Sequence, residues 1–393
     1  MSEDSIVIVA ARRTPIGSFQ GALAPVTAPA LGATAIRAVL ENTAITDTEI
    51  DEVLMGCVLP AGVGQAPARQ ALLQAGLAVK VPAVTINKVC GSGMKTVMLA
   101  HDEIRAGTHV IVIAGGMESM SNAPYLLPGA RSGYRMGHHQ VLDHMFFDGL
   151  QNPYDNNMMG FFAECTADKY HFTREVQDAF AIDSVERSQT AIATGAFAAE
   201  IVPITVKTRK NETVVDTDEE PGRAKPEKIP GLRPAFRKDG TVTAASSSSI
   251  SDGAAALLLM RESEAARRGL APLVRIVAHA GAAQEPAWFT TAPVAAIRAV
   301  LDKANWSPDG VDLYEINEAF AVVTLAAEKD LRLDHAKVNV NGGACALGHP
   351  IGCSGARILV TLIHALRSRG LARGVAALCI GGGEATAIAV ETL

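Results

Sequence analysis

The feature that most constrains the fold of this chain is an internal repeat. Residues 38–56, AVLENTAITDTEIDEVLMG, align without a gap with residues 299–317, AVLDKANWSPDGVDLYEIN. Both segments begin Ala-Val-Leu, and each carries an aspartate thirteen residues after the first alanine, Asp51 in one and Asp312 in the other. Each segment predicts a helix, a turn and then a strand, at residues 53–55 and 313–316.

A second pair of segments repeats in the same register. Residues 84–119 and 338–386 both run from a strand through a glycine-rich turn and Ser-Gly into an apolar helix, a strand and Gly-Gly. Ser92 and Ser354 lie 262 residues apart, and Ala38 and Ala299 lie 261 apart. Such agreement indicates a duplication. In a chain of 393 residues it predicts two related α/β halves, with mainly parallel sheets covered by helices.

The stretch between the halves has a different character. Residues 122–243 are rich in Met, Pro, Gly and charged residues, with one amphipathic helix expected around residues 174–194. The stretch is typical of an insertion, and long insertions often cover active sites. The chain returns to a core strand at residues 252–260. We therefore expect an N-terminal half of residues 1–121 plus 244–270, an inserted loop domain of 122–243 and a C-terminal half of 271–393.

Composition excludes several classes of protein. The net charge is −6 and no long basic stripe occurs, which argues against a nucleic-acid partner. No apolar run reaches the roughly 18 to 20 residues of a membrane span. The sequence opens with acidic residues and has no signal-like leader, so we expect a cytoplasmic protein. None of the six cysteines falls in a Cys-x-x-Cys pair, so we expect reduced thiols and no metal site.

Cys90 stands in NKVCGSG, residues 87–93, between an apolar run and a glycine-rich turn. A strand followed by this turn and a helix places the thiol at a helix N-terminus, where the helix dipole favours negative charge. Such a setting can lower a cysteine pKa from roughly 8.5 to the range of about 3.5 to 7.5. Cys90 is therefore a candidate nucleophile, and the alternative is a packing cysteine.

His349 occupies the equivalent turn of the second half, in NGGACALGHPIGCSGAR, residues 341–357. A nucleophilic cysteine needs a base, and imidazole titrates in the right range. If the halves pack about a pseudo-twofold axis, Cys90 and His349 face each other across it. The alternative is a structural histidine in a loop.

Two further motifs stand at the predicted ends of strands in the second half. Cys379 opens CIGGGEA, whose glycines leave backbone N–H groups free to bind an oxyanion. Cys379 is either an acid/base acting on a carbon acid or a buried core cysteine. Asn317 opens NEAFA, where its amide can hold a water or polarise a carbonyl, or can cap the following helix.

Some polar groups carry weaker signals. The serines at 246–249 predict either a flexible loop or a hydrogen-bonding surface for a ligand. Basic residues near Arg223 predict a solvated face, of which a few members could meet phosphates. His138, His139 and His144 fall in a polar loop without a matching ligand set, so we expect them to be solvated.

The combination of four motifs in this order resembles the thiolase family: Cys-Gly-Ser-Gly, Asn-Glu-Ala-Phe, Gly-His-Pro and Cys-x-Gly-Gly-Gly. The resemblance runs from VIVAARRTPIGSFQGAL to CIGGGEATAIAV, over the whole chain. It implies the thiolase fold, in which two α/β halves form a layered αβαβα core, and dimers that often assemble into tetramers. It also implies acyl transfer to and from coenzyme A, which is substrate and product, with no tightly bound cofactor.

The resemblance assigns roles to individual residues. Cys90 resembles the acyl-carrying nucleophile and His349 the base that activates it. Cys379 resembles the acid/base that deprotonates the methyl carbon of the second acetyl-CoA, or protonates the enolate in thiolysis. Asn317, through a water, joins His349 in holding the thioester oxygen of that enolate, and backbone N–H groups of Cys90 and Gly381 form the other oxyanion hole. Contacts with coenzyme A are expected from Ser248, Ala244, Phe320, Arg223 and Met158.

The sequence also departs from the family pattern. Met158-Met159-Gly160 stands where short-chain members carry His-Met-Gly, and Ser246 replaces an asparagine. DEEPGRAKPEKIPGL resembles the mitochondrial-type acetoacetyl-CoA thiolases.

We expect condensation of two acetyl-CoA to acetoacetyl-CoA and coenzyme A, in a homotetramer acting in fatty acid metabolism. The alternatives are a broader-chain degradative 3-ketoacyl-CoA thiolase and a catalytically silent acyl-CoA-binding or lipid-binding protein of this shape. A decarboxylating ketoacyl synthase is disfavoured by Cys379, because that class uses His–His or His–Asn partners.

Overall fold

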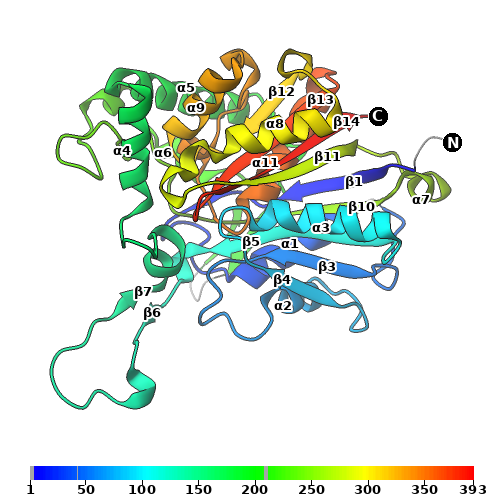
Figure 1. Cartoon of the computed structure of the whole chain (residues 1–393). Helices are drawn as coiled ribbons and strands as arrows, with labels where there is room; N and C mark the ends of the chain where they lie inside the picture. The colour runs from blue at the N-terminus through cyan, green and yellow to red at the C-terminus, as the bar shows by residue number, and fades with distance from the viewer. Residues whose placement is uncertain (1–3, 42, 208–210) are drawn as a thin grey trace.

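The computed structural model describes residues 4–41, 43–207 and 211–393, and it shows a mixed α/β protein built on one large sheet (Figure 1). The strands lie in the order β12 (Leu313–Ile316), β13 (Arg373–Ile380), β14 (Glu384–Thr392), β11 (Val274–Ala283), β1 (Ile6–Arg13), β10 (Ser251–Arg261), β5 (Ile111–Ser119), β3 (Glu52–Gly56) and β4 (Ala83–Ile86), with β2 (Gly17–Ser18) beside β10.

The predicted duplication is visible in this order. The first half reads β4, β3, β5, β10, β1, and the second half reads β12, β13, β14, β11, with a bridge from Tyr314 of β12 to Val338 in the place of β4. Helix α1 (Ala28–Leu40) precedes β3 as α8 (Ala292–Ala304) precedes β12. Helices α3 (Ser92–Ala106) and α11 (Ser354–Arg369) follow the two glycine-rich turns. The halves join where β1 and β11 pair antiparallel.

The expectation of mainly parallel pairing is wrong. β3 is parallel to β4 and β5, and β12 is parallel to β13, but the pairings β5–β10, β10–β1, β1–β11, β11–β14 and β14–β13 are antiparallel. The reason lies in the connections. β13 returns directly into β14 through Gly382 and Gly383, whose φ angles of +92° and +90° suit glycine. A tight turn of this kind joins antiparallel neighbours, whereas parallel neighbours need a crossover.

The strands of the two halves pack on opposite sides of the middle helices, so the one hydrogen-bonded sheet supplies two layers in the order helix, sheet, helix, sheet, helix. Helices α3 and α11 share one apolar cluster with strands of both halves, and therefore form the middle layer. Helices α1 and α2 (Pro67–Gln74) pack on the outer face of the first half. Helix α8 packs on the outer face of the second half, beside α9 (Ala321–Leu331). This is the layered αβαβα core that the resemblance implies.

The two middle helices approach most closely at their first turns. A Cβ atom on Gly355 would lie 2.4 Å from the backbone nitrogen of Met94, and one on Gly93 would lie 2.8 Å from that of Ala356. No side chain fits at either position, so both must be glycine. Gly93 and Gly355 follow the repeated serines, and their contact brings the turn containing Cys90 to the turn containing His349.

The repeated aspartates, Asp51 and Asp312, make the same kind of hydrogen bonds in the two halves. Oδ2 of Asp51 accepts the N–H groups of Val110 and Ile111, at 2.8 and 2.9 Å, where β5 begins. Oδ2 of Asp312 accepts those of Ala372 and Arg373, at 3.0 and 2.8 Å, where β13 begins. Each carboxylate thereby fixes the start of a central strand.

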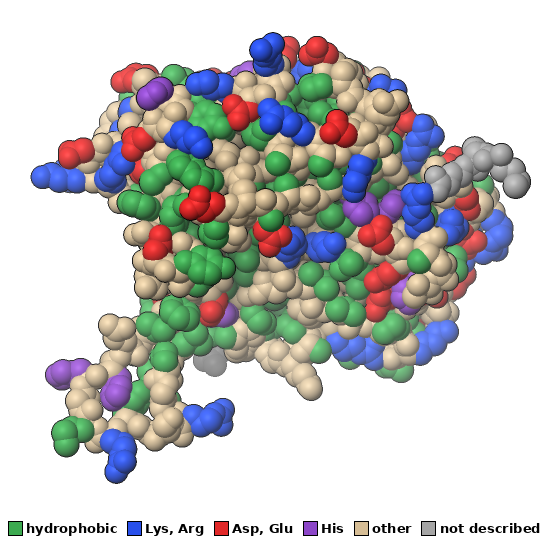
Figure 2. Space-filling model, in the orientation of Figure 1, with side chains coloured by type: hydrophobic (Ala, Val, Ile, Leu, Met, Phe, Trp, Pro, Cys, Tyr) green, Lys and Arg blue, Asp and Glu red, His purple; other side chains and the backbone are tan. Residues whose placement is uncertain are grey.

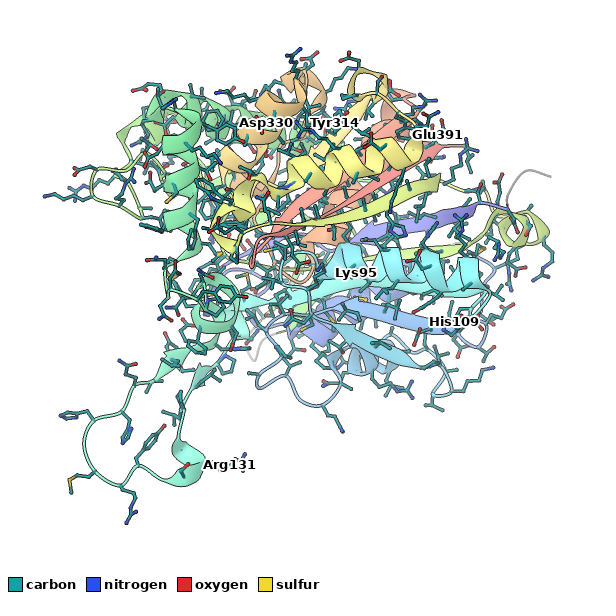
Figure 3. All side chains as sticks on the ribbon, in the orientation of Figure 1. Lys95, His109, Arg131, Tyr314, Asp330 and Glu391 are labelled. Carbon is teal, nitrogen blue, oxygen red and sulfur yellow. The ribbon has the colours of Figure 1, made fainter. Side chains whose placement is uncertain are left out.

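The insertion lies between β5 and β10. It contains α4 (Met159–Tyr170), α5 (Arg174–Ala193), α6 (Glu219–Arg223) and two separate strand pairs, β6 (Tyr125–Leu126) with β7 (Leu142–Asp143) and β8 (Ile204–Lys207) with β9 (Glu212–Val215). Helix α5 confirms that a helix lies around residues 174–194, but the expectation that it is amphipathic is wrong, because its buried face carries polar side chains such as Gln177 and Ser184. The β6–β7 hairpin, residues 125–143, extends from the body as an arm (Figure 1), and Arg131 lies near its end (Figure 3).

Short elements complete the described ranges. They are α7 (Glu262–Arg267), α10 (Ala344–Leu347), a π-helical turn at Phe146–Leu150, and 3₁₀ turns at Met120–Asn122, Ala130–Ser132, Pro226–Gly231, Pro286–Thr291, Pro308–Gly310 and His335–Lys337. Among the residues described, no helix combines the length and apolar character needed to cross a membrane.

The loop histidines differ from one another. His138 and His139 are exposed, as expected for solvated side chains. The expectation is wrong for His144, which is buried at the base of the arm. Its Nε2 accepts the N–H of Ala61 at 3.3 Å, and its Nδ1 lies 2.5 Å from Oδ2 of Asp148. The base of the arm packs against the first half, which the sequence does not indicate.

Candidate active site

Turns from both halves meet at one cavity. Cys90 lies between β4 and α3, His349 lies before α11, and Gly381 lies between β13 and β14. These three residues line one cavity that is open to solvent. The packing about a pseudo-twofold axis therefore brings the two turns together, as the repeat predicts.

The turn containing Cys90 is tight and strained. The N–H of Gly91 donates to Lys88 O at 3.0 Å, and that of Ser92 donates to Val89 O at 3.1 Å. Val89 has a φ of +46°, which is rare for a β-branched residue and costs on the order of 1 to 3 kcal/mol. Helix α3 starts at Ser92, so Cys90 stands at its N-terminus, where the sequence places it.

The expectation of a lowered pKa for Cys90 is wrong. Burial raises the pKa of the Cys90 thiol to about 11, although hydrogen bonds from the N–H groups of Gly381 and of Cys90 itself act to lower it. The walls of the cavity thus disfavour the thiolate more than the helix terminus favours it. The two N–H groups that approach the sulfur belong to the residues expected to form an oxyanion hole.

Cys379 lies behind this turn, at the end of β13. Its side chain is fully buried, and it is absent from the described residues that line the cavity. Burial raises the pKa of Cys379 well above its ordinary value, and the nearby thiol of Cys90 raises it further. The two thiols are therefore close enough to interact electrostatically.

The surroundings of His349 fix how its ring is protonated. Ser354 Oγ donates to Pro350 O at 3.0 Å, and the same oxygen lies 2.5 Å from His349 Nδ1. Because the hydroxyl proton goes to the carbonyl, Nδ1–H donates to Ser354 and Nε2 keeps its lone pair. Burial, and then the positive charge of Arg357, lowers the pKa of His349 to about 3, so the imidazole is neutral. Nε2 is buried without a hydrogen-bond partner in the described part of the chain, which suits a proton acceptor.

Asn317 lies beside this imidazole. Its Nδ2 is 3.5 Å from His349 Nδ1, and its Oδ1 is buried without a partner in the ranges that the structure covers. The alternative role as a helix cap is wrong, because α9 begins at Ala321 and Phe320 holds the cap position. Asn317 therefore belongs spatially to the group around His349.

The expected coenzyme A contacts divide into two sets. Ser248, Phe320 and Met158 line the cavity, and Ser248 Oγ donates to Ala319 O at 3.0 Å. Ala244 is exposed and Arg223 pairs with Glu219 at 2.7 Å, and neither is among the described residues at the cavity wall. The serine run is an ordered segment, since Ser246 and Ser247 are buried and hydrogen-bonded to Thr243.

Sequence reasoning missed most of the cavity wall, which is apolar. Its further members include Met120, Phe146, Leu150, Phe236, Phe289 and Ile351. They come from separated segments without a shared motif, so no sequence pattern marks them. In the sequence, Ser354 stands out only as a landmark of the repeat. It follows His349 by five residues and lies one helical turn beyond Pro350, and this spacing is the signal that indicates its contact with the imidazole.

Comparisons with known proteins agree with this geometry. Residues 6–263 match the family model described as Thiolase, N-terminal domain, and residues 270–392 match Thiolase, C-terminal domain. The chain belongs to the thiolase family. The resemblance drawn from its motifs is thereby confirmed.

Similar thiolases come from several bacteria and from a nematode. The acetyl-CoA acetyltransferase of Pseudomonas aeruginosa is 52% identical over 98% of both chains, and that of Escherichia coli K12 is 52% identical over 98% of this chain and 99% of its own. The crystal structure of the Bacillus anthracis acetyl-CoA acetyltransferase has a TM-score of 0.97 at 44% identity, covering 100% of this chain and 99% of that one. A thiolase from Ascaris suum in complex with coenzyme A has a TM-score of 0.94 at 43% identity, covering 99% of this chain and 100% of its own.

Proposed function

We propose that this thiolase condenses two acetyl-CoA molecules reversibly into acetoacetyl-CoA and coenzyme A, through an acyl group on Cys90. The observation that carries the proposal is the neutral His349, which lines the same cavity as Cys90 and Gly381 and whose Nε2 has no hydrogen-bond partner among the described residues. The relatives named acetyl-CoA acetyltransferases support this choice of substrate.

The first step transfers an acetyl group to Cys90. His349 Nε2 takes the thiol proton as the sulfur attacks the thioester carbonyl, and the N–H groups of Cys90 and Gly381 hold the resulting oxyanion. Each such donor contributes about 2.7 to 4 kcal/mol. The carbon–sulfur bond to coenzyme A then breaks, and His349 returns the proton to the departing thiolate. The products are acetyl-Cys90 and free coenzyme A.

The second step makes a carbon–carbon bond. Cys379 first gives its thiol proton to His349 and then, as a thiolate, removes a proton from the methyl carbon of a second acetyl-CoA. The protonated His349 and a water held by Asn317 stabilise the enolate oxygen. The enolate carbon attacks the acetyl group on Cys90, and the carbon–sulfur bond to Cys90 breaks. Acetoacetyl-CoA leaves and His349 gives its proton to the Cys90 sulfur. Cys379 keeps the methyl proton, so both thiols and the neutral imidazole are restored.

The proposed reaction also suggests roles for the inserted domain, for coenzyme A and for assembly of the subunits. We assign coenzyme A binding and oligomerisation to the inserted domain of residues 122–243, between halves of 1–121 plus 244–270 and of 271–393. Coenzyme A enters and leaves with each turnover and is not a resident cofactor. All six cysteines are free, which suits the reducing cytoplasm, and the exposed arm suits assembly into a homotetramer.

Intact-protein mass spectrometry with peptide mapping tests the proposal. The reduced protein is mixed separately with acetyl-CoA, acetoacetyl-CoA and a longer 3-ketoacyl-CoA. We expect an acetyl adduct on the Cys90 peptide from the first two substrates, and formation of acetoacetyl-CoA. Labelling by the longer substrate at an equal rate would favour the broader-chain thiolase. Binding without any adduct would favour the silent acyl-CoA-binding protein.

A further inference from the structure

Away from the catalytic cavity, two imidazoles and a carboxylate converge on one point. His101 and Asp102 lie near the end of α3, and His279 lies on β11. We propose that these three side chains bind a divalent metal ion of the zinc type, which fastens the first half of the molecule to the second.

The spacing of the three ligand atoms supports the proposal. Asp102 Oδ1 lies 3.0 Å from His101 Nδ1 and 2.9 Å from His279 Nε2, and the two nitrogens are 3.2 Å apart. A tetrahedral zinc ion with bonds of about 2.0 to 2.1 Å holds neighbouring ligand atoms about 3.3 Å apart. The triangle thus needs to widen by only a few tenths of an ångström to become one face of that tetrahedron.

The burial of the three side chains suits an ion that enters from solvent. The side chains of His101 and His279 are only 9% and 16% exposed, whereas that of Asp102 is 52% exposed. The rings are therefore held by packing, edge to face with centroids 4.9 Å apart. The open side at Asp102 leaves room for a water as fourth ligand.

The site differs from the catalytic centre in position and role. His101 lies nine residues along α3 from Ser92, a rise of about 14 Å. The ligands come from elements that are distant in sequence, which is why a search for closely spaced cysteines and histidines does not find them. An ion here would tie α3, the middle-layer helix of the first half, to strand β11 of the second half.

A neighbouring cluster provides a matched control. Glu52, Glu103 and His109 gather near the other side of the end of α3, where Figure 3 labels His109. His109 Nε2 lies 3.2 Å from Glu52 Oε2. This cluster offers one imidazole and two carboxylates, a donor set that suits zinc less well than two imidazoles, so we expect it to bind zinc more weakly.

Calorimetric titration with Zn²⁺ tests the proposal. The protein is purified without a polyhistidine tag, stripped with a chelator and studied in a Cys90→Ser background, so that the nucleophilic thiol does not compete. We expect one equivalent to bind, His279→Gln and Asp102→Asn each to weaken binding at least about tenfold, and His109→Gln to leave it unchanged. Asp102 is exposed, so the second variant folds even if the first does not.

Two further readouts decide the outcome. Co²⁺ in place of Zn²⁺ should give tetrahedral ligand-field bands without thiolate charge-transfer bands, and Zn²⁺ should raise Tm in the background protein but not in its Asp102→Asn variant. Absence of a bound equivalent would overturn the proposal. So would binding that survives both His279→Gln and Asp102→Asn, or thiolate bands that move the ion to a cysteine.

Discussion

Cys90 and His349 line the same cavity, Cys90 as an uncharged thiol and His349 as an uncharged imidazole. The raised pKa of Cys90, about 11, and the lowered pKa of His349, about 3, both disfavour a resting thiolate–imidazolium pair. Because a thiolate is the form that reacts with iodoacetamide, the inactivation rate constant of the free enzyme should rise steadily from about pH 7 to about pH 10. The measurement is inactivation kinetics at a series of pH values, followed by mapping of the modified peptide. A plateau at neutral pH would show that the thiolate is already formed.

The two halves of the reaction should separate by substitution. Cys379→Ala should leave acetylation of Cys90 intact and abolish condensation, since Cys379 is assigned only to the carbon acid. His349→Ala should slow acetylation itself, by about 10² to 10⁴-fold, which is the usual contribution of a general base. Rapid-quench mass spectrometry measures the adduct, and acetoacetyl-CoA formation measures the condensation.

Cys165→Ala is the control for that pair. Cys165 is a partly buried thiol on α4 and is not among the described residues of the cavity wall. Both steps should proceed at the parent rate in this variant. Condensation at the parent rate in Cys379→Ala would refute the role of Cys379, and unchanged acetylation in His349→Ala would remove His349 as the base.

At the scale of secondary structure, the repeated aspartates offer a paired test. Asp51→Ala and Asp312→Ala each remove a carboxylate that accepts two backbone N–H groups at the start of a central strand. Each change should lower the free energy of unfolding by about 2 to 3 kcal/mol, since hydrogen bonds to charged groups contribute roughly 1.5 to 3 kcal/mol. Urea denaturation followed by circular dichroism measures both.

The double variant extends this test. The two aspartates lie in different halves and share no partner, so their effects should add. Asp47→Ala, in the exposed turn before Asp51, is the control and should change little. A large effect in one half and none in the other would contradict the shared role that the repeat assigns to them.

Local sequence patterns predict the positions of the helices and strands well. They do not predict strand direction, which depends on the connections between strands. The helix, turn and strand of each repeat depend on nearby residues, so β3, β12, α3 and α11 lie where the sequence puts them. Strand direction depends instead on how the chain returns. β14 follows β13 through a glycine turn, and β10 follows β5 only after the whole insertion. Alternation of strands and helices therefore suggested more parallel pairing than the sheet contains.

The candidate site divides in the same way. Cys90, His349 and Gly381 belong to glycine-rich turns, and Cys379 ends the strand before one of them, so local sequence motifs mark all four. No local motif marks the apolar wall of the cavity, because Phe146, Phe236 and Phe289 come from separate segments and meet only after folding. The error in the pKa of Cys90 has this origin. The helix terminus is visible in the sequence, whereas the burial that outweighs it is not.

For the whole molecule, the arm predicts how copies assemble. It carries exposed apolar side chains, with Tyr125 68% and Met136 92% exposed, and Figure 2 shows apolar side chains gathered where it leaves the body. Replacing residues 127–141 with a short Gly-Ser turn should convert the proposed tetramer into dimers. Light scattering coupled to size-exclusion chromatography measures the mass.

Point variants refine the test of the arm. Met136→Glu should weaken the tetramer, whereas Val214→Glu, at an exposed apolar position on β9, should not. An unchanged mass for the deletion variant would show that the arm does not hold the assembly.

A buried ionic group joins the insertion to both halves. Arg13 of β1 binds Glu200 through Nε at 2.6 Å and Asp218 through both terminal nitrogens at 2.7 and 2.9 Å, and all three side chains are fully buried. Thr361 of α11 donates to the same Glu200 oxygen at 3.1 Å. Arg13→Met should cost about 3 to 5 kcal/mol of unfolding free energy, because it leaves two carboxylates buried without their cation.

The accompanying variants separate charge from geometry. Arg13→Lys keeps the charge but cannot reproduce the bidentate contact with Asp218, so its loss should be smaller but still clear. Arg267→Met breaks an exposed pair with Glu264 and should have little effect, because solvent already screens that pair. Denaturant unfolding compares the three. If Arg13→Met were no worse than Arg267→Met, the buried group would not be what holds the insertion on the core. If Arg13→Lys were as damaging as Arg13→Met, the planar fork of the guanidinium, rather than its charge, would be the decisive property.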